Sequence, residues 1–378
     1  MKNVVIVEYC RSPFTPALKG QLAKVRPDDL VAQVVKGLMD KVTIEQQDIE
    51  DLILGCAFPE GEQGMNMARL IVHLAGLPVS VAGMTVNRFC GSSMQAIHLA
   101  AGAIQMNAGD VFICAGVESM SRIPMGGYNM MPNPALYKSY PEAYVSMGES
   151  AENLANQYHL SREAQETFTL ESQRKAYKAQ QQGCFDDEVV AIETAAGIVS
   201  MDGCLRPDST AEGLSGLKPA FIATGSVTAG TSSPLTDGAA AVLVCSEDYA
   251  DKHGLNKMAR IKSIAVSACG PEVMGIGPVN ATQKALQRAD LSLGDIDIVE
   301  LNEAFAAQSL AVLSDLPVPA LKLNLDGGAI ALGHPLGATG ARIVGKAASL
   351  LQRQHKKYAL ATQCIGGGQG IATILEAI

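Results

Sequence analysis

The 378-residue chain contains no tryptophan, and all its aromatic residues together make up only 4% of it. A core must therefore be built from Ala, Val, Ile, Leu and Met, and hydrophobic residues do reach 48%. Positive charge is also scarce, because 29 Lys and Arg stand against 38 Asp and Glu, a formal net charge of −9. This balance argues against a general nucleic-acid binder, which needs a basic surface. A local site for an anionic ligand is still compatible with it.

The sequence also lacks paired cysteines and long apolar runs. Its nine cysteines are odd in number and no two show Cys-x-x-Cys spacing, which argues against a metal site and a disulfide framework. No apolar stretch approaches the length of a membrane span, and the apolar run at the N-terminus predicts a strand rather than a signal peptide. We therefore expect a cytoplasmic protein with no bound metal and no membrane span.

The order of strand-like and helix-like segments predicts an α/β protein with mainly parallel sheets and two related halves. DIEDLILGCAF (residues 48–58) aligns without a gap with DIDIVELNEAF (295–305). Each follows a helix-like segment and precedes a Gly-rich turn, a small-residue helix and a further strand, which indicates an internal repeat. The predicted divisions are a first half in 1–117 plus 236–257, an inserted loop domain in 118–235, and a second half in 258–378.

Cys90 stands between a strand-like run and a helical run, in TVNRFCGSSMQAIHLAAGAIQ (residues 85–105). A lone cysteine in an apolar neighbourhood is usually buried and inert. Here apolar residues at helical spacing follow it and place it at a helix N-terminus, where free N–H groups and the helix dipole stabilise a thiolate. We therefore predict a nucleophile whose pKa is lowered by a unit or more from about 8.5.

His334 occupies the matching place in the second half, within the glycine-rich GGAIALGHPLGATGAR. A lone histidine is more often structural than catalytic. Two helix N-termini related by pseudo-symmetry can nevertheless meet, which would bring Cys90 and His334 together as nucleophile and base. Cys364 and Asn302 follow or end predicted strands, where open α/β sheets place their sites, although an ordinary strand end or a surface loop is the alternative.

Six motifs carry a resemblance that covers essentially the whole chain: VNRFCGSSMQA, GTSSPLTDGAA, VMGIGPV, LNEAFAAQSL, GGAIALGHPLGATGAR and CIGGGQGIA. Together they resemble the thiolase family, and they are most similar to its degradative 3-ketoacyl-CoA thiolases. The resemblance implies the thiolase fold. That fold has two duplicated βαβαβαββ halves in a five-layer α-β-α-β-α sandwich with an inserted loop domain. It also implies a homo-oligomer, either a dimer or a dimer of dimers.

The resemblance further implies thiolytic cleavage of 3-ketoacyl-CoA by coenzyme A in fatty-acid β-oxidation, through an acyl-cysteine intermediate. Cys90 would be the nucleophile and Cys364 the acid/base. His334 would activate Cys90 and, with a water held by Asn302, polarise the thioester oxygen. The backbone N–H groups of Cys90 and Gly366 would form a second oxyanion hole.

The substrate is expected to contact Met147, Lys218, Ser233, Met274, Ala304 and Phe305. No tightly bound cofactor is implied, since coenzyme A is a co-substrate held by the inserted domain. The family often has Arg where Lys218 stands, so bidentate contact with the cofactor is not expected here. From the residues alone, Lys218 and Arg206 would be solvated surface charges.

Three alternatives stay open. A biosynthetic acetoacetyl-CoA thiolase uses the same residues to condense two acetyl-CoA. A decarboxylating ketoacyl synthase shares the fold but usually has histidine or asparagine where Cys364 stands. An acyl-CoA-binding protein would use the fold without catalysis, which the intact catalytic set argues against. A multifunctional β-oxidation subunit is a partner that the resemblance suggests and no motif in the chain shows.

Overall fold

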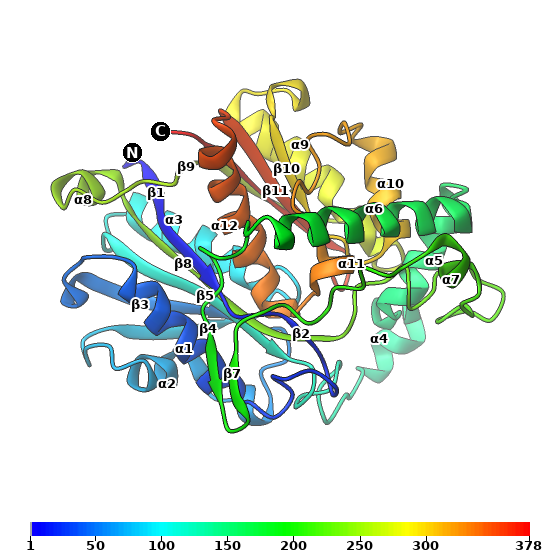
Figure 1. Cartoon of the computed structure of the whole chain (residues 1–378), viewed down its shortest axis with the longest axis horizontal. Helices are drawn as coiled ribbons and strands as arrows, with labels where there is room; N and C mark the ends of the chain where they lie inside the picture. The colour runs from blue at the N-terminus through cyan, green and yellow to red at the C-terminus, as the bar shows by residue number, and fades with distance from the viewer. Residues whose placement is uncertain (1) are drawn as a thin grey trace.

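The computed structural model describes residues 2–378, and its main sheet runs through both halves of the chain (Figure 1). The strands are β1 (Val4–Arg11), β2 (Thr15–Pro16), β3 (Ile49–Gly55), β4 (Ala82–Val86), β5 (Val111–Ser119), β6 (Ile192–Thr194), β7 (Gly197–Val199), β8 (Thr236–Ser246), β9 (Ala259–Ala268), β10 (Ile298–Leu301), β11 (Tyr358–Ile365) and β12 (Gln369–Glu376). The helices are α1 (Pro27–Asp40), α2 (Met67–Leu74), α3 (Ser92–Gln105), α4 (Pro134–Ser139), α5 (Met147–Gln157), α6 (Arg162–Gln181), α7 (Ala211–Ser215), α8 (Glu247–Lys252), α9 (Gly277–Ala289), α10 (Ala306–Asp315), α11 (Ala329–Leu332) and α12 (Leu336–Gln354).

The two halves repeat one strand order. The main sheet runs β4-β3-β5-β8-β1 through the first half and β9-β12-β11-β10 through the second, and the segment at Leu323 pairs in parallel with Val299 of β10. We number the strands of each half along the chain and count the Leu323 segment as the third strand of the second half. Across the sheet, the strands of both halves then lie in the order 3-2-4-5-1. The repeat between 48–58 and 295–305 therefore corresponds to β3 and β10.

The expectation of mainly parallel sheets was wrong. Among β1–β5 and β8–β12, only the pairs β3–β4, β3–β5 and β10–β11 are parallel, as is the bridge from β10 to Leu323, and the other strand pairs of the main sheet are antiparallel. Parallel pairs arise where a helix crosses over between strands. The chain instead returns to β8 after the long insertion and to β12 through a tight turn, and both strands enter antiparallel.

The helices lie in layers around the strands, as the thiolase fold predicts. α3 and α12 fill the central layer, α1 and α2 cover the outer face of the first half, and α9 and α10 cover that of the second (Figure 1). α12 is buried almost all round, and it reaches close contact through small residues. A Cβ at Gly340 would lie 2.3 Å from the Met94 nitrogen of α3. The N-termini of α3 and α12 therefore lie side by side.

Buried ion pairs join the insertion to both halves. Arg11 of β1 pairs with Glu188 at 2.8 Å and with Asp202 at 2.7 Å. Lys346 of α12 pairs with Glu188 at 2.6 Å and with Asp326 at 3.0 Å. Removing one partner of a buried pair leaves an uncompensated charge and typically costs about 3–5 kcal/mol. The insertion is thus held in a defined position against β1 and α12.

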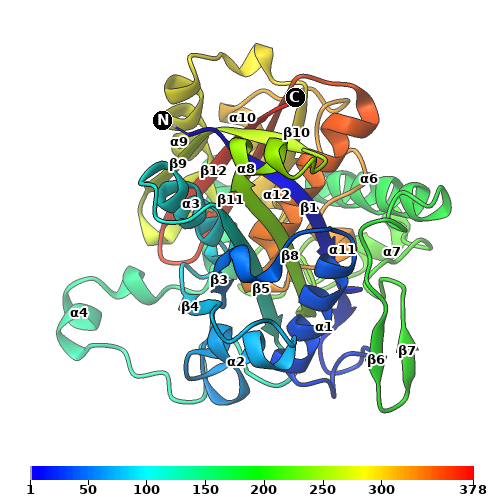
Figure 2. The same ribbon diagram turned by 90° about the vertical axis from the view of Figure 1, so that its left-hand side faces the viewer.

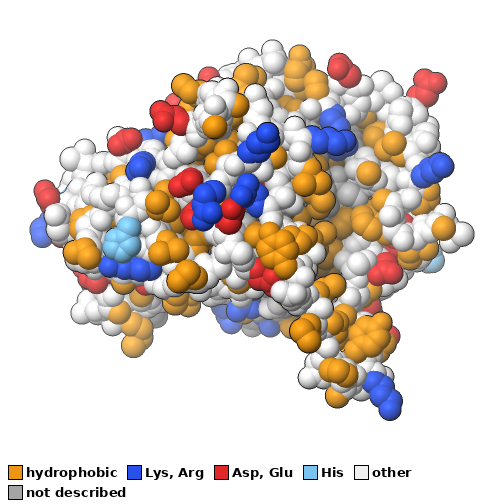
Figure 3. Space-filling view, turned by 90° about the horizontal axis from the view of Figure 1, so that it is seen from below, with side chains coloured by type: hydrophobic (Ala, Val, Ile, Leu, Met, Phe, Trp, Pro, Cys, Tyr) orange, Lys and Arg blue, Asp and Glu red, His pale blue; other side chains and the backbone are white. Residues whose placement is uncertain are grey.

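Part of the insertion stands apart from the body. Figure 2 shows α4 projecting away from the sheet, and the same lobe carries hydrophobic side chains at the lower right of Figure 3. Met130, Met131 and Tyr137 in this region are 71%, 88% and 55% exposed. Across residues 2–378, no helix combines the length and apolar character needed to cross a bilayer.

Candidate active site

One cavity of about 530 Å³ contains the side chains of Cys90, His334 and Cys364. It lies where the N-termini of α3 and α12 meet the end of β11. All three side chains are buried, with exposed fractions of 2%, 4% and 0%. The rest of the lining is largely apolar and includes Met120, Met147, Phe221, Met274, Phe305 and Leu336. The cavity therefore combines a thiol pair and an imidazole with walls suited to an acyl chain.

A tight turn directs Cys90 into this cavity. Phe89 adopts a left-handed conformation with φ of 42°, which is strained for a bulky residue. The hydroxyl of Ser92 holds the turn, because it accepts from the Arg88 N–H at 2.9 Å and donates to the Phe89 carbonyl at 2.6 Å. The side-chain amide of Gln363 donates to the Cys90 carbonyl. A strained backbone held by several hydrogen bonds is typical of functional sites.

The pKa of Cys90 was predicted in the wrong direction. Burial raises it to about 12, because a thiolate in this cavity loses its hydration. Hydrogen bonds from the backbone N–H of Gly366 and of Cys90 itself lower the pKa, and the charge of Glu118 raises it. Desolvation outweighs the donors at the helix N-terminus. The resting protein therefore holds a neutral thiol at Cys90.

We expect alkylation of Cys90 by iodoacetamide to accelerate about tenfold for each pH unit between pH 7 and 9 without reaching a plateau. The thiolate fraction grows in this way wherever the pH lies below the pKa, which here is raised to about 12. Mass spectrometry of the Cys90 peptide measures the rate. A short cysteine peptide with both ends blocked is the control, since its rate levels off above its pKa of about 8.5. A plateau for Cys90 below pH 8 would restore the original expectation of a lowered pKa.

His334 is held by three contacts from three directions. Its backbone N–H donates to Thr236 Oγ1 at 3.0 Å, Nδ1 lies 2.6 Å from Thr339 Oγ1, and Nε2 lies 3.3 Å from Asn302 Nδ2. Burial, reinforced by the positive charge of Arg342, lowers the pKa of His334 to about 3. The ring is therefore neutral and can accept a proton.

Asn302 lies directly after β10 and is fully buried. Its backbone N–H donates to the Thr362 carbonyl at 3.0 Å, so the end of β10 is held against β11. Its Oδ1 accepts no hydrogen bond from residues 2–378. An unpaired buried amide oxygen costs about 1–3 kcal/mol, so this group is positioned at the cost of stability.

Cys364 lies near the end of β11, paired with Gly370 of β12. Burial raises its pKa well above the ordinary value, and a negative charge on Cys90 would raise it further. The two sulfurs are therefore close enough for their charges to oppose each other, so one thiolate at a time is favoured. Gly366 follows two residues later and directs its N–H to the Cys90 sulfur.

Five of the six residues expected at the substrate line this cavity: Met147, Ser233, Met274, Ala304 and Phe305. Lys218 does not. Its side chain is exposed, two residues before Ala220, which does line the cavity. Arg206, expected to be a solvated surface charge, contributes to the cavity wall while it stays exposed.

The sequence patterns did not identify three residues that position catalytic groups without lining the cavity. Thr339 contacts the His334 ring, and its position inside the GHPLGATG motif was the only available signal. Gln363 holds the Cys90 carbonyl from a strand far along the chain. Glu118, at the end of β5, accepts from the backbone N–H groups of Ala57 and Gly337, each at 2.9 Å, and so joins the two halves beneath the cavity.

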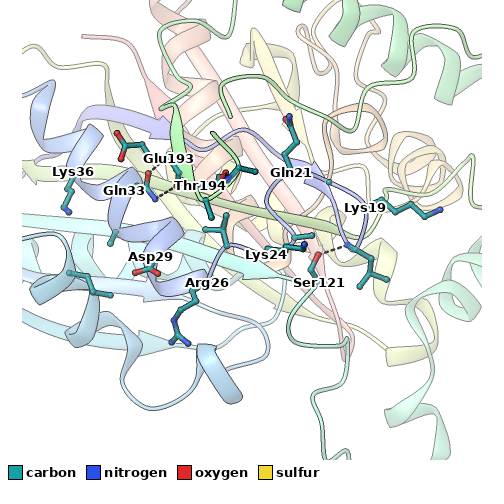
Figure 4. A pocket seen from close by; sticks show the side chains of 18 residues that line it. Lys19, Gln21, Lys24, Arg26, Asp29, Gln33, Lys36, Ser121, Glu193 and Thr194 are labelled. Carbon is teal, nitrogen blue, oxygen red and sulfur yellow. Dashed lines mark hydrogen bonds between the residues drawn. The ribbon is translucent and has the colours of Figure 1, made fainter. Parts of the chain in front are cut away.

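A larger depression of about 940 Å³ lies elsewhere, between the 18–26 loop, α1 and the β6–β7 hairpin (Figure 4). Its wall carries the basic side chains Lys19, Lys24 and Lys36. The residues that line it, within the described chain, include neither cysteine nor histidine. Size alone therefore does not identify the active site, and the smaller cavity is the one that holds a nucleophile and a base.

Comparisons with known proteins agree with this geometry. Residues 4–248 match the family model "Thiolase, N-terminal domain" and residues 255–377 match "Thiolase, C-terminal domain". A 3-ketoacyl-CoA thiolase of Bacillus subtilis (strain 168) is 46% identical, with 100% of both chains covered. The crystal structure of human mitochondrial 3-ketoacyl-CoA thiolase in complex with CoA has a TM-score of 0.92 at 38% identity, covering 100% of this chain and 98% of that one. The Bacillus anthracis acetyl-CoA acetyltransferase has a TM-score of 0.91 at 39% identity, covering 100% and 99%.

Proposed function

This chain belongs to the thiolase family, and we propose that its cavity catalyses the thiolytic cleavage of 3-ketoacyl-CoA by coenzyme A. The products are acetyl-CoA and an acyl-CoA shortened by two carbons, as in fatty-acid β-oxidation. The observation that carries this proposal is the placement of Cys90, His334 and Cys364 in one buried, largely apolar cavity. The chemistry of each residue follows from its surroundings.

Cys90 and His334 act together in the first step. The sulfur attacks the 3-keto carbon while its proton moves to His334 Nε2. Both groups are neutral at rest, because burial raises the pKa of the thiol to about 12 and lowers that of the imidazole to about 3. Proton transfer therefore accompanies the attack. The alkoxide that forms lies against the N–H groups of Cys90 and Gly366, and losing one such donor typically costs about 10²–10³ in rate.

The C2–C3 bond then breaks, and its electron pair passes into the acetyl-CoA enolate. The oxygen of the enolate accepts from protonated His334 and from a water held by Asn302. Cys364 donates its proton to C2, which releases acetyl-CoA, and its raised pKa keeps it protonated for this purpose at neutral pH. The acyl group remains on Cys90.

Coenzyme A completes the cycle. Its thiol gives its proton to the Cys364 thiolate and attacks the acyl group, and the departing Cys90 sulfur recovers its proton from His334. A thiolate is both a good nucleophile and a good leaving group, which accounts for cysteine rather than serine at position 90. No external oxidant, reductant or metal enters this balance.

We expect turnover when the protein is mixed with coenzyme A and 3-ketoacyl-CoA substrates of increasing chain length, followed by loss of the enolate absorbance. The apolar cavity wall favours substrates longer than acetoacetyl-CoA. Heat-denatured protein is the control. No turnover at any chain length would refute the proposed function. Activity with acetoacetyl-CoA alone would support the biosynthetic alternative. The similarity to a 3-ketoacyl-CoA thiolase of B. subtilis does not favour that alternative.

We also propose that residues 118–235 form a separate loop domain that holds coenzyme A. Exposed Lys218, next to the cavity wall at Ala220, would meet a phosphate of the cofactor as a point charge. Exposed ion pairs contribute little, so Lys218→Ala should raise the KM for coenzyme A only several-fold and leave kcat nearly unchanged. Lys284→Ala, at an exposed site on α9, is the control. An unchanged KM would remove Lys218 from the site.

We further propose a cytoplasmic homo-oligomer. β4 is the edge strand of the sheet, and the side chain of its Met84 is 38% exposed. Met65 and Phe89, nearby in sequence, are 86% and 38% exposed. An edge strand and exposed apolar side chains support a contact with a second copy or with a multifunctional β-oxidation subunit. All nine cysteines are free, which supports a reducing compartment. A monomeric mass by light scattering at micromolar concentration would argue against self-association.

A further inference from the structure

Thr339, in the first turn of α12, sits against the imidazole of His334. Its side chain is completely buried, and its Oγ1 lies 2.6 Å from His334 Nδ1. The same oxygen lies 3.1 Å from the Pro335 carbonyl one turn earlier, in a geometry suited to donation. The side-chain hydrogen bonds of Thr339 go to His334 and Pro335 and to neither of the two catalytic sulfurs. Its contact with the ring therefore calls for a role that acts through His334.

We propose that Thr339 is a positioning residue that keeps His334 in the tautomer with its hydrogen on Nδ1, so that Nε2 has a lone pair that can take the proton of Cys90. A hydroxyl has one hydrogen. If that hydrogen is donated to the Pro335 carbonyl, the oxygen can only accept from the ring, and Nδ1 must carry a hydrogen. This inference refines the function proposed above and depends on it for its catalytic meaning.

The opposite side of the ring leads to the same assignment. The side-chain nitrogen of Asn302 faces Nε2 at 3.3 Å. An amide nitrogen is a donor only, so with the amide in this orientation Nε2 accepts and carries no hydrogen of its own in the resting state. Two independent contacts, on two different nitrogens, therefore specify one tautomer.

Other contacts fix the backbone of His334. Its ring could still rotate, and Thr339 restricts that rotation. The His334 N–H donates to Thr236 Oγ1 at 3.0 Å, and Gly333 before it has φ of 101°. A Cβ at Gly333 would lie 2.7 Å from the Thr236 side chain, so only glycine allows this approach. With the chain held in this way, the Nδ1 contact determines where Nε2 points.

The tautomer matters at both stages of the proposed reaction. With a hydrogen on Nε2, the ring would present no lone pair to the Cys90 thiol; the wrong tautomer in a serine-protease triad lowers kcat about 10⁴-fold. After Nε2 takes the proton, both nitrogens are donors. Nδ1 then donates to Thr339, and Nε2 donates to the developing enolate oxygen. The hydroxyl cannot accept the proton itself, so the charge stays on the imidazole ring.

Thr339→Val tests this role with little change of shape. The Pro335 carbonyl still accepts from the N–H groups of residues 338 and 339, so the substitution leaves it bonded. We expect kcat to fall about 10²-fold, the upper end of the effect of orienting partners at metal-bound histidines, with KM changed less than about threefold. Thr339→Ser should restore most of the activity. Thr282→Val, which removes another buried hydroxyl outside the cavity, is the control for packing.

The tautomer can be observed without turnover. In protein labelled with ¹⁵N-histidine, and with the His334 signals assigned by their loss in His334→Gln, we expect a protonated Nδ1 and an unprotonated Nε2. In Thr339→Val the two nitrogen shifts should move toward each other as the tautomers mix. A protonated Nε2 in the resting wild-type protein would overturn the proposal, as would Thr339→Val with wild-type kcat and shifts. The spectrum needs no substrate. A failure to cleave 3-ketoacyl-CoA would therefore refute the proposed function, while the spectrum would still report the tautomer.

Discussion

Cys90→Ala is expected to lower kcat for thiolysis by at least about 10⁴-fold, the scale of losing a catalytic nucleophile. The two oxyanion donors and the substrate cavity remain in the variant, but no atom is left to receive the acyl group. No other thiol can substitute for Cys90. Cys364 lines the same cavity, but burial raises its pKa well above the ordinary value, and it is needed for proton transfer.

Two measurements check this prediction. Steady-state rates give the loss of kcat, and intact mass spectrometry after brief exposure to acyl-CoA shows whether an acyl adduct remains. The fold should survive, because the change removes only one sulfur and the weak hydrogen bond that this sulfur accepts from the Gly366 N–H. Cys184→Ala, at a partly buried cysteine outside the cavity, is the matched control and should keep wild-type activity. A stoichiometric acyl adduct on Cys90→Ala would show that the nucleophile has been misassigned.

Cys364→Ala is expected to lower thiolysis about 10²–10⁴-fold, the usual contribution of a general acid or base. Acylation of Cys90 should be affected far less, since its proton goes to His334. The two cysteines therefore separate experimentally: one carries the acyl group, and the other exchanges protons with the substrate carbon. Burial raises the pKa of Cys364, so it stores a proton at neutral pH and releases it only to a strongly basic carbanion.

Exchange in D₂O isolates this step. Wild-type protein with acetyl-CoA should incorporate deuterium into the acetyl methyl group, and Cys364→Ala should not. The same variant should still transfer labelled acetyl from acetyl-CoA to Cys90. If exchange and acyl transfer fall together, Cys364 supports the site as a whole rather than moving the proton. If exchange continues at the wild-type rate, another group is the acid.

Much of the architecture was predictable from local patterns. The fold class is confirmed by the family matches and the solved structures. The internal repeat was visible because eleven aligned residues encode the same buried strand and turn in each half, and these became β3 and β10. Strand direction was less accessible. It depends on how the chain returns to the sheet, and the long insertion before β8 concealed an antiparallel entry.

The features of the candidate site also divide into those that neighbouring residues encode and those that only the fold determines. The sequence by itself determined which residues can react and that Cys90 and His334 precede helices, because motifs and helix starts are properties of neighbouring residues. Only the tertiary structure decided their protonation. It removed water from Cys90, brought the Gly366 N–H to its sulfur from the turn after β11, and set Thr339 and Asn302 on opposite nitrogens of His334. Solvation and hydrogen-bond direction depend on atoms distant in the chain, and for that reason a pKa predicted to fall has risen.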